Sequence, residues 1–395
     1  MPRKTSLETI AVHAGRDDLV ELGIHALPID LSTTYPFADL QEAVDSLDAL
    51  VEGEATASNP VYARLHNPTV ARFEVGLAAL EDTDAAVAFG SGMAALTACL
   101  LAARSDERNH IVGVRPMYAS TDKLISSGYL GLDVTWTNAG SIAEAVRPDT
   151  ALVLIETPVN PTIELQDIAA AAEAAGDVPL CVDSTFASPV LQRPAAHGAA
   201  LVMHSGTKFL GGHGDVMAGV VACSETWAKR LRKVRVFTGA ILHPMAAYLL
   251  HRGLTTLPLR VLRSQETART LAERLKVQPF VERVLYPTVD GCDPHGLVGR
   301  QMDGPGPMLS FEVSGGFEAA DRLMRGLKLI TPAVSLGSVD TLIQHPAGLT
   351  QRVVSEETRA SGGVSDGLLR VSLGLEAADD LWADLEQALG QAAGV

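Results

Sequence analysis

Residues 85–114 read AAVAFGSGMAALTACLLAARSDERNHIVGV, and this stretch decides the fold. It begins with a short apolar run, continues through a Gly/Ser turn into a helix-like segment over Gly92–Arg104, and ends in a second apolar run. Continuous apolar runs of this kind are typical of parallel strands that are buried on both faces of a sheet. The stretch therefore predicts a strand–helix–strand unit of a wound α/β domain.

The same alternation extends to about residue 222, with a second helix-like segment over Leu165–Ala175. Ligands of such sheets bind beyond the carboxyl ends of the strands, so residues that follow the apolar runs are the first candidates for a site. The predicted strands are AAVAF (85–89), HIVGV (110–114), LDVTW (132–136), ALVLI (151–155), PLCV (179–182), ALVMH (200–204) and AGVVA (218–222).

The segments on either side have a different pattern. Residues 1–60 are expected to be irregular and to form an arm that contacts a neighbouring subunit, followed by a large domain over 61–255. Residues 256–395 predict a smaller α+β domain. Its expected elements are an amphipathic helix around Glu266–Lys276, the strands MLSFEV (308–313) and LLRVSLG (368–374), and a final helix with Leu381, Leu385, Ala388 and Leu389 on one face.

Composition narrows the function classes. The 395 residues include 47 acidic and 31 basic side chains, a net charge of −16, which argues against nucleic acid and anionic membranes as main partners. The 4 cysteines show no CxxC pair and no zinc-ligand spacing, so we expect no metal site and a reduced, cytoplasmic protein. The amino-terminal residues lack the apolar stretch of a signal peptide, and no apolar run is long enough to cross a bilayer.

Lys208 lies in SGTKFLGGHGD (205–215), directly after the apolar run ALVMH. A free lysine has a pKa near 10.4. It therefore attacks carbonyl groups only when burial or a neighbouring cation lowers that pKa, or when it is held as a Schiff base. A covalent role for Lys208 is one interpretation, and an ordinary surface lysine is the alternative for this segment taken alone.

The turn in FGSGMAALTACL (89–100) is a candidate phosphate site. The first amides of the predicted helix, at Gly92 and Met93, have no partner within the helix and lie at the positive end of its dipole. Ser205 and Thr207 would add two hydroxyl donors if the phosphate also contacted the lysine loop. Taken alone, a glycine turn before a helix is more often a matter of chain geometry.

Three further side chains follow predicted strands. Asp183 would need a partner if ionised among apolar residues, and a protonated pyridine nitrogen is one candidate. Tyr118 could stack on a planar ring, and Asn160, in ETPVNPT (156–162), could donate to a phenolate oxygen. Each also has an ordinary interpretation as a cap, core or turn residue. Together with the lysine and the anion site, however, they are expected to meet in one cleft and to specify pyridoxal 5′-phosphate.

The order of these motifs resembles that of the Cys/Met-metabolism family of pyridoxal-phosphate enzymes, which includes methionine and cystathionine γ-lyases and cystathionine γ-synthase. The resemblance implies a fold-type I, aspartate-aminotransferase-like architecture, with a mostly parallel sheet in the large domain and a smaller α+β carboxyl-terminal domain. It covers nearly the whole chain and rests on YARLHNPT, SGMAA, ETPVNPT, VDSTFASP, HSGTKFLGGHGD, VSLGSVDTLIQHP and DGLLRVSLGLE.

The resemblance also implies a role for each matching residue. Lys208 would bind the cofactor covalently and act as the base, Asp183 would pair with the ring nitrogen, and Tyr118 would stack on the ring and, helped by Tyr62, protonate the leaving thiolate. The remaining cofactor-binding residues would be Gly92, Met93, Asn160, Thr185, Ser205 and Thr207, with Tyr62 and Arg64 supplied by a neighbouring subunit. The substrate would contact Arg370, Ser335, Val334 and Asn160.

The implied activity is a γ-elimination that converts methionine or a cystathionine-type sulfur amino acid to a 2-oxo acid, ammonia and a thiol. Val334 stands where cystathionine-processing relatives usually have a glutamate, and an apolar side chain tolerates a methyl thioether but cannot pair with a distal ammonium group. A γ-replacement transferase, such as cystathionine γ-synthase or an O-acylhomoserine sulfhydrylase, would use the same residues and remains an alternative. A catalytically inactive binding protein of this fold is the third.

Some positions depart from the family pattern. Ser120 stands where methionine γ-lyases carry a cysteine, and Arg235–Val236 replaces their Lys–Asp pair, so strict methionine specificity stays open. His66 and Gln351 are further departures, to which we assign no consequence. The resemblance finally implies a homo-oligomer, a tetramer built from dimers that share their active sites.

Overall fold

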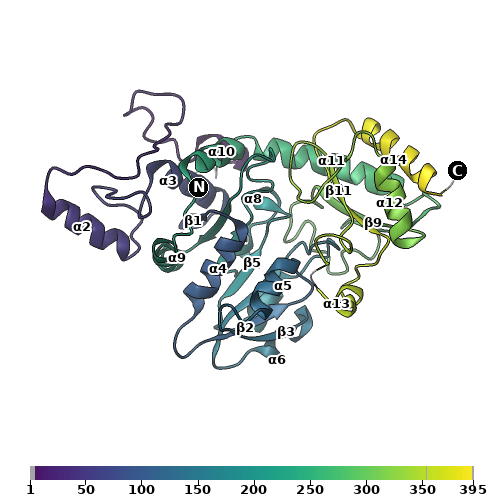
Figure 1. Ribbon diagram of the computed structural model, residues 1–395, viewed down its shortest axis with the longest axis horizontal. Coiled ribbons are helices and arrows are strands. Elements are labelled where there is room, and N and C mark those ends of the chain that lie inside the picture. The colour runs from purple at the N-terminus through teal and green to yellow at the C-terminus, as the bar shows by residue number, and fades with distance from the viewer. Residues whose placement is uncertain (1–4, 353, 394–395) are drawn as a thin grey trace.

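The computed structural model describes residues 5–352 and 354–393, which form two sheets with their covering helices (Figure 1). The larger sheet has seven strands in the order β1-β7-β6-β5-β4-β2-β3. All the apolar runs predicted to be strands in this part of the chain are strands. Their bounds are β1 Ala85–Phe89, β2 His110–Val114, β3 Asp133–Thr137, β4 Thr150–Glu156, β5 Leu180–Asp183, β6 Leu201–His204 and β7 Gly219–Cys223.

Two strands differ from the prediction of buried parallel strands. β7 runs antiparallel to both of its neighbours, β1 and β6. No helix lies between β6 and β7, so the chain returns without the crossover that a parallel neighbour requires. β3 is an edge strand with no buried residue, so its LDVTW run is not that of a strand buried on both faces. The rest of the sheet is parallel, as expected.

The larger sheet is buried on both faces, as strand β1 illustrates. Ala86 and Ala88 belong to the core cluster that includes α3 and α10, whereas Val87 and Phe89 belong to the cluster that includes α4 and α9. Burial on both faces explains why these strands are continuously apolar. The helices of this region are α3 Pro68–Glu81, α4 Gly92–Ala103, α5 Ala119–Ser126, α6 Ile142–Ala145, α7 Ile168–Ala175, α8 Ser188–Leu191, α9 Glu225–Thr238 and α10 Pro244–Leu254, with 3-10 turns at Ala139–Ser141 and Pro194–His197.

The carboxyl-terminal part has a five-stranded sheet in the order β10-β11-β12-β9-β8, antiparallel except for the β10–β11 pair. The predicted strands and final helix are present, and the helix expected around Glu266–Lys276 begins earlier, at Leu257. The change of sheet after β7 fits a domain boundary near residue 255, which stays a prediction. The elements are α11 Leu257–Leu275, β8 Val281–Leu285, β9 Met308–Val313, α12 Gly316–Gly326, β10 Thr331–Pro332, β11 Leu342–Gln344, α13 Glu356–Ser361, β12 Leu368–Ser372 and α14 Ala378–Ala393.

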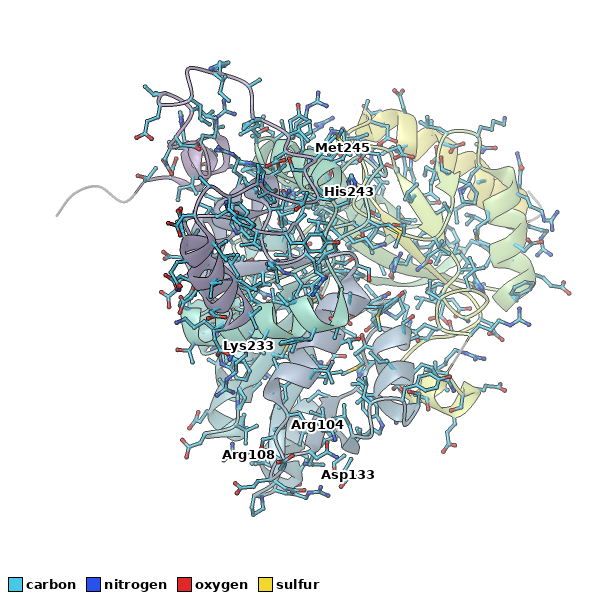
Figure 2. The ribbon with its side chains drawn as sticks, turned by 60° about the vertical axis from the view of Figure 1, so that its left-hand side comes forward. Arg104, Arg108, Asp133, Lys233, His243 and Met245 are labelled. Carbon is cyan, nitrogen blue, oxygen red and sulfur yellow. The ribbon has the colours of Figure 1, made fainter. Side chains whose placement is uncertain are left out.

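The amino-terminal segment contains two helices, α1 Leu7–His13 and α2 Leu40–Val51, so the expectation of an irregular arm is wrong over these ranges. α2 begins where the side chain of Asp39 accepts a hydrogen bond from the amide of Glu42. The helix lies at the edge of the molecule (Figure 1), and Lys233 of α9, which Figure 2 labels, forms an ion pair with Glu52, the residue that follows α2. Across the described ranges, no helix combines the length and the apolar character that crossing a membrane would require.

Candidate active site

A cavity of about 470 Å³ lies at the carboxyl ends of β4, β5 and β6, where the sequence placed the site. The structure brings together in its walls every predicted site residue except Tyr62 and Arg64. Those residues are Gly92, Met93, Tyr118, Asn160, Asp183, Thr185, Ser205, Thr207, Lys208, Val334, Ser335 and Arg370.

The amino end of α4 forms one wall of the cavity. Ser91 caps this helix by accepting a hydrogen bond from the amide of Ala94 at 3.1 Å, and the amides of Gly92 and Met93 precede the first bond within the helix. A Cβ at position 92 would lie 3.2 Å from Ser205 Oγ, so glycine allows the serine hydroxyl to approach the helix end closely. Two amides, a hydroxyl and a helix dipole form a donor set that fits a phosphate dianion.

Thr207 differs from the prediction in one respect. Its hydroxyl donates to the carbonyl oxygen of Ala218 at 3.2 Å and accepts from the Ala218 amide at 3.0 Å. The Thr207 hydroxyl is therefore bonded to the backbone of Ala218, and it would have to turn in order to donate to a phosphate. Ser205 is the hydroxyl that is better placed for that contact.

Lys208 follows β6, and its Nζ donates to Ser335 Oγ at 2.7 Å. Burial, assisted by the positive charge of Arg370, lowers the pKa of Lys208 to about 8. The loop that carries Ser335 lies against the lysine backbone, because a Cβ at Gly337 would come within 2.8 Å of the Lys208 carbonyl carbon. Ser335 itself has a φ of 90°, a strained conformation for a residue with a side chain.

Asp183 is the last residue of β5, and its Oδ1 accepts hydrogen bonds from the amide and the hydroxyl of Thr185. The Thr185 hydroxyl in turn accepts from the amide of Ser205 at 2.9 Å, which connects Asp183 to the lysine loop. Burial raises the pKa of Asp183 in spite of the Thr185 hydrogen bonds. A buried carboxylate of this kind is stabilised by a cation, so its chemistry fits a protonated ring nitrogen.

Arg370 lies on β12 and connects the smaller sheet to the cavity. It is buried, which lowers the pKa of its guanidinium to about 9. The guanidinium donates to Asn160 Oδ1 at 2.9 Å and to the carbonyl oxygen of Ser335 at 2.7 Å. Because Asn160 uses its side-chain oxygen as the acceptor, its amide nitrogen is left as a donor, as the predicted contact with a phenolate oxygen requires.

Glu156 is a residue of the site to which the sequence analysis gave no role. It ends β4, is buried and lines the cavity, and it accepts hydrogen bonds from the amides of Tyr118 and Asn160 at 2.7 and 2.6 Å. Burial and the neighbouring Asp183 raise the pKa of Glu156 to about 8. Its position at the end of a fully apolar strand, the same signal that identified Asp183, could have revealed it.

The mouth of the cavity is apolar. Val334 is 53 % exposed and Met217 is 68 % exposed, and both line the cavity together with Leu349. The sequence analysis singled out Val334 but missed Met217 and Leu349. No motif marks these two positions, because an apolar residue in a loop gives no sign of which surface it will join.

Tyr62 and Arg64 lie outside the cavity of their own chain. Tyr62 is 45 % exposed, and the guanidinium of Arg64 lies 5.7 Å from its ring centre and donates to the carbonyl oxygen of Val236 at 2.6 Å. A role for this pair in a neighbouring chain stays a prediction.

The departures from the family pattern lie in different surroundings. Arg235 forms a buried ion pair with Glu74 at 2.5 Å, and Gln351 donates to the carbonyl oxygen of Asn160 at 3.4 Å. Burial is the main cause that lowers the pKa of His66. Ser120 does not line the cavity, although its neighbour Tyr118 does.

Comparison with known proteins agrees with this geometry. The sequence model described as Cys/Met metabolism PLP-dependent enzyme matches residues 8–390. An L-methionine gamma-lyase from Streptomyces avermitilis is 54 % identical over 98 % of the chain and 90 % of its own length, and one from Brevibacterium sandarakinum is 53 % identical over 97 % of each. Among solved structures, cystathionine gamma synthase from Xanthomonas oryzae pv. oryzae, in complex with aminoacrylate and cysteine, has a TM-score of 0.91 at 34 % identity, covering 99 % of this chain and 100 % of that one.

Proposed function

The chain belongs to the Cys/Met-metabolism family of PLP-dependent enzymes, and from this premise we propose that it is a carbon–sulfur lyase that catalyses the γ-elimination of methionine or a related sulfur amino acid. Its fold is the fold-type I architecture of that family. The products would be a 2-oxo acid, ammonia and a thiol. One observation carries the proposal: a single cavity contains the Lys208 amine, the buried Arg370 guanidinium and an apolar mouth that includes Val334.

The residues of the cavity would hold the cofactor as follows. The amides of Gly92 and Met93 and the hydroxyl of Ser205 would bind its phosphate, and Asp183 would keep its ring nitrogen protonated. Tyr118 would stack on the ring. When bound, pyridoxal phosphate withdraws electrons from the substrate Cα and so makes its proton acidic.

The reaction also needs groups that orient the substrate and move protons. Arg370 would bind the substrate carboxylate, a task that suits a planar guanidinium. Lys208 Nζ would take the proton from Cα, because a pKa of about 8 leaves part of the amine neutral near pH 7. Tyr118, helped by Tyr62 of a neighbouring chain, would donate a proton to the departing thiolate.

The apolar mouth supports a thioether substrate. Val334, Met217 and Leu349 offer the far end of the substrate no charged partner, so they would accommodate a methyl thioether better than the distal amino-acid group of cystathionine. The two L-methionine gamma-lyases at 53–54 % identity support the same choice.

The test is to incubate the purified holoenzyme with methionine, with cystathionine and with an O-acylated homoserine, each with and without added thiol. We expect 2-oxo acid and thiol from methionine without any acceptor. Product that forms only when a thiol is added would reject the lyase and favour the γ-replacement transferase, a function that the structural likeness to cystathionine gamma synthase keeps under consideration. A purified protein that is colourless and inactive with all three substrates would reject both the lyase and the transferase.

We further propose that the enzyme is a homo-oligomer, a tetramer built from dimers that share their active sites, and that it works in the reducing cytoplasm. Tyr62 and Arg64 lie outside the cavity of their own chain, which supports shared active sites. Cys99, Cys181 and Cys223 are buried free thiols, which supports a reducing compartment. Mixing and reassembling inactive Arg64→Ala and Lys208→Ala chains should restore activity, up to about a quarter of wild type for random pairing, because half of the dimers would contain one intact site. No recovery in chains that exchange would refute shared sites.

A further inference from the structure

We infer that Glu156 is a positioning residue whose carboxylate holds Tyr118 and Asn160 in place together, and through Asn160 also orients Arg370. The inference rests on the proposed function only in taking these three side chains as the ones that meet cofactor and substrate.

The geometry of the carboxylate is the first argument. Its Oε2 accepts from the amide of Tyr118 at 2.7 Å and its Oε1 from the amide of Asn160 at 2.6 Å, so each oxygen has its own donor. The donors come from separate segments: Tyr118 stands at the start of α5, and Asn160 lies in the loop after β4. Both hydrogen bonds end on the same carboxyl group, so they join the two segments at a single point.

The second argument is what the two held residues do next. Asn160 Oδ1 accepts from Arg370 at 2.9 Å, and the carbonyl oxygen of Asn160 accepts from Gln351. A shift of the Asn160 backbone would therefore move the guanidinium on β12, which belongs to the other sheet. Glu156 stands at the start of a chain of contacts that runs from the end of β4 to the predicted carboxylate-binding arginine.

The third argument is the energetic cost of this placement. Glu156 pairs in register with Asp183 on the neighbouring strand, so a buried and a half-buried carboxyl group lie side by side. Placing two carboxyl groups next to each other away from water is unfavourable, and packing alone would favour an apolar residue at position 156. A carboxyl group presents one oxygen to each of the two amides, whereas an amide side chain of the same shape presents its NH₂ group to one of them and an apolar side chain accepts from neither.

The test compares Glu156→Gln and Glu156→Asp with Glu164→Gln, a control that removes an exposed carboxylate from the same loop. In Glu156→Gln the side-chain NH₂ faces one of the two backbone donors, so one hydrogen bond is lost while size is kept. Affinity of the cofactor-free protein for pyridoxal phosphate is measured by fluorescence titration, and the bound cofactor by visible circular dichroism. kcat and KM are measured separately with the best substrate found.

We expect Glu156→Gln to weaken cofactor affinity about tenfold and to alter the circular dichroism of the cofactor, with KM raised and kcat lowered. Glu156→Asp, which keeps the carboxyl group but shortens the reach, should recover part of both signals, and Glu164→Gln should match wild type. A Glu156→Gln protein with wild-type cofactor affinity, dichroism and KM would overturn the inference, as would a lowered melting temperature as its only effect.

Should Glu156→Gln fail to fold, Glu156→Asp decides by the same readings: an altered dichroism and KM in a folded protein support the positioning role, and wild-type values refute it. The binding and dichroism measurements do not depend on which sulfur amino acid is cleaved. A wild-type protein that binds the cofactor but leaves methionine intact would therefore refute the proposed function without affecting the test of Glu156.

Discussion

The carboxyl edge of the larger sheet and the amino-terminal segment over residues 5–60 place their side chains in opposite ways. At the sheet edge, the titratable groups Glu156 and Arg370 are buried around a cavity, and Asp183 is half-buried beside them. In the amino-terminal segment, apolar side chains such as Leu31, Phe37 and Leu40 are exposed. Buried charges need a ligand or a polar partner, and clustered exposed apolar groups need a covering surface. This contrast supports the proposal that the cofactor completes one region and a second chain covers the other.

The largest effect should come from removing the amine at the sheet edge. We expect Lys208→Ala to lower the rate of 2-oxo acid formation from the best substrate by at least about a thousandfold, because the base and the covalent attachment are lost together. Borohydride should then no longer fix the cofactor to the protein, as measured by mass spectrometry. Retained activity or retained fixation would mean that the buried groups at this edge do not form the site.

The second-largest expected effect tests whether the exposed apolar side chains of the amino-terminal segment contact a second chain. Leu40→Asp, at a 69 % exposed position in the first turn of α2, should weaken self-association about tenfold or more in sedimentation measurements. An acidic residue is favourable at that end of a helix, so α2 itself should persist. The matched control is Leu259→Asp, at a 71 % exposed position in the first turn of α11. If the control dissociates the protein and Leu40→Asp does not, the interface lies elsewhere.

A third prediction concerns pH. Burial, and secondly Arg370, lower the pKa of Lys208 to about 8, and only the neutral amine attacks an aldehyde. The rate at which cofactor-free protein captures pyridoxal phosphate should therefore rise about tenfold per pH unit below the pKa and level off above about pH 8. Arg370→Leu should move this midpoint upward. A rate that keeps rising to pH 10, measured by stopped-flow absorbance, would identify an ordinary solvated lysine.

The smallest expected effect distinguishes a role of α4 in cofactor binding from a role of its cap in helix stability alone. Ser91→Ala and Ser224→Ala each remove the side-chain cap of a helix, α4 and α9 respectively. Each should lower the melting temperature by about 1–2 °C. Only Ser91→Ala should also weaken pyridoxal phosphate binding, because α4 begins at the cavity. Equal cofactor affinity in the two variants would show that the amino end of α4 does not bind the cofactor.

Local pattern predicted the strands well and the amino-terminal helices poorly. A run such as ALVLI is apolar because both faces of β4 are covered, so its composition alone reveals its environment. α2 buries only Ala43, Ser46 and Leu50 and leaves Val44 and Leu47 exposed, so its pattern does not resemble that of a helix packed on a core. The antiparallel direction of β7 was also missed, since an apolar run carries no sign of the direction of its strand.

By itself, the sequence determined which residues follow the buried strands, and hence that Asp183 and Lys208 would lie at one edge of a sheet. The reason is physical: parallel strands bring their carboxyl ends together whatever lies between them. Only the tertiary structure decided that Glu156 joins Tyr118 to Asn160, that Arg370 reaches them from the other sheet, and that Met217 lies at the mouth. Such contacts depend on distances between segments far apart in the chain, which the packing of helices and sheets sets and no local pattern encodes.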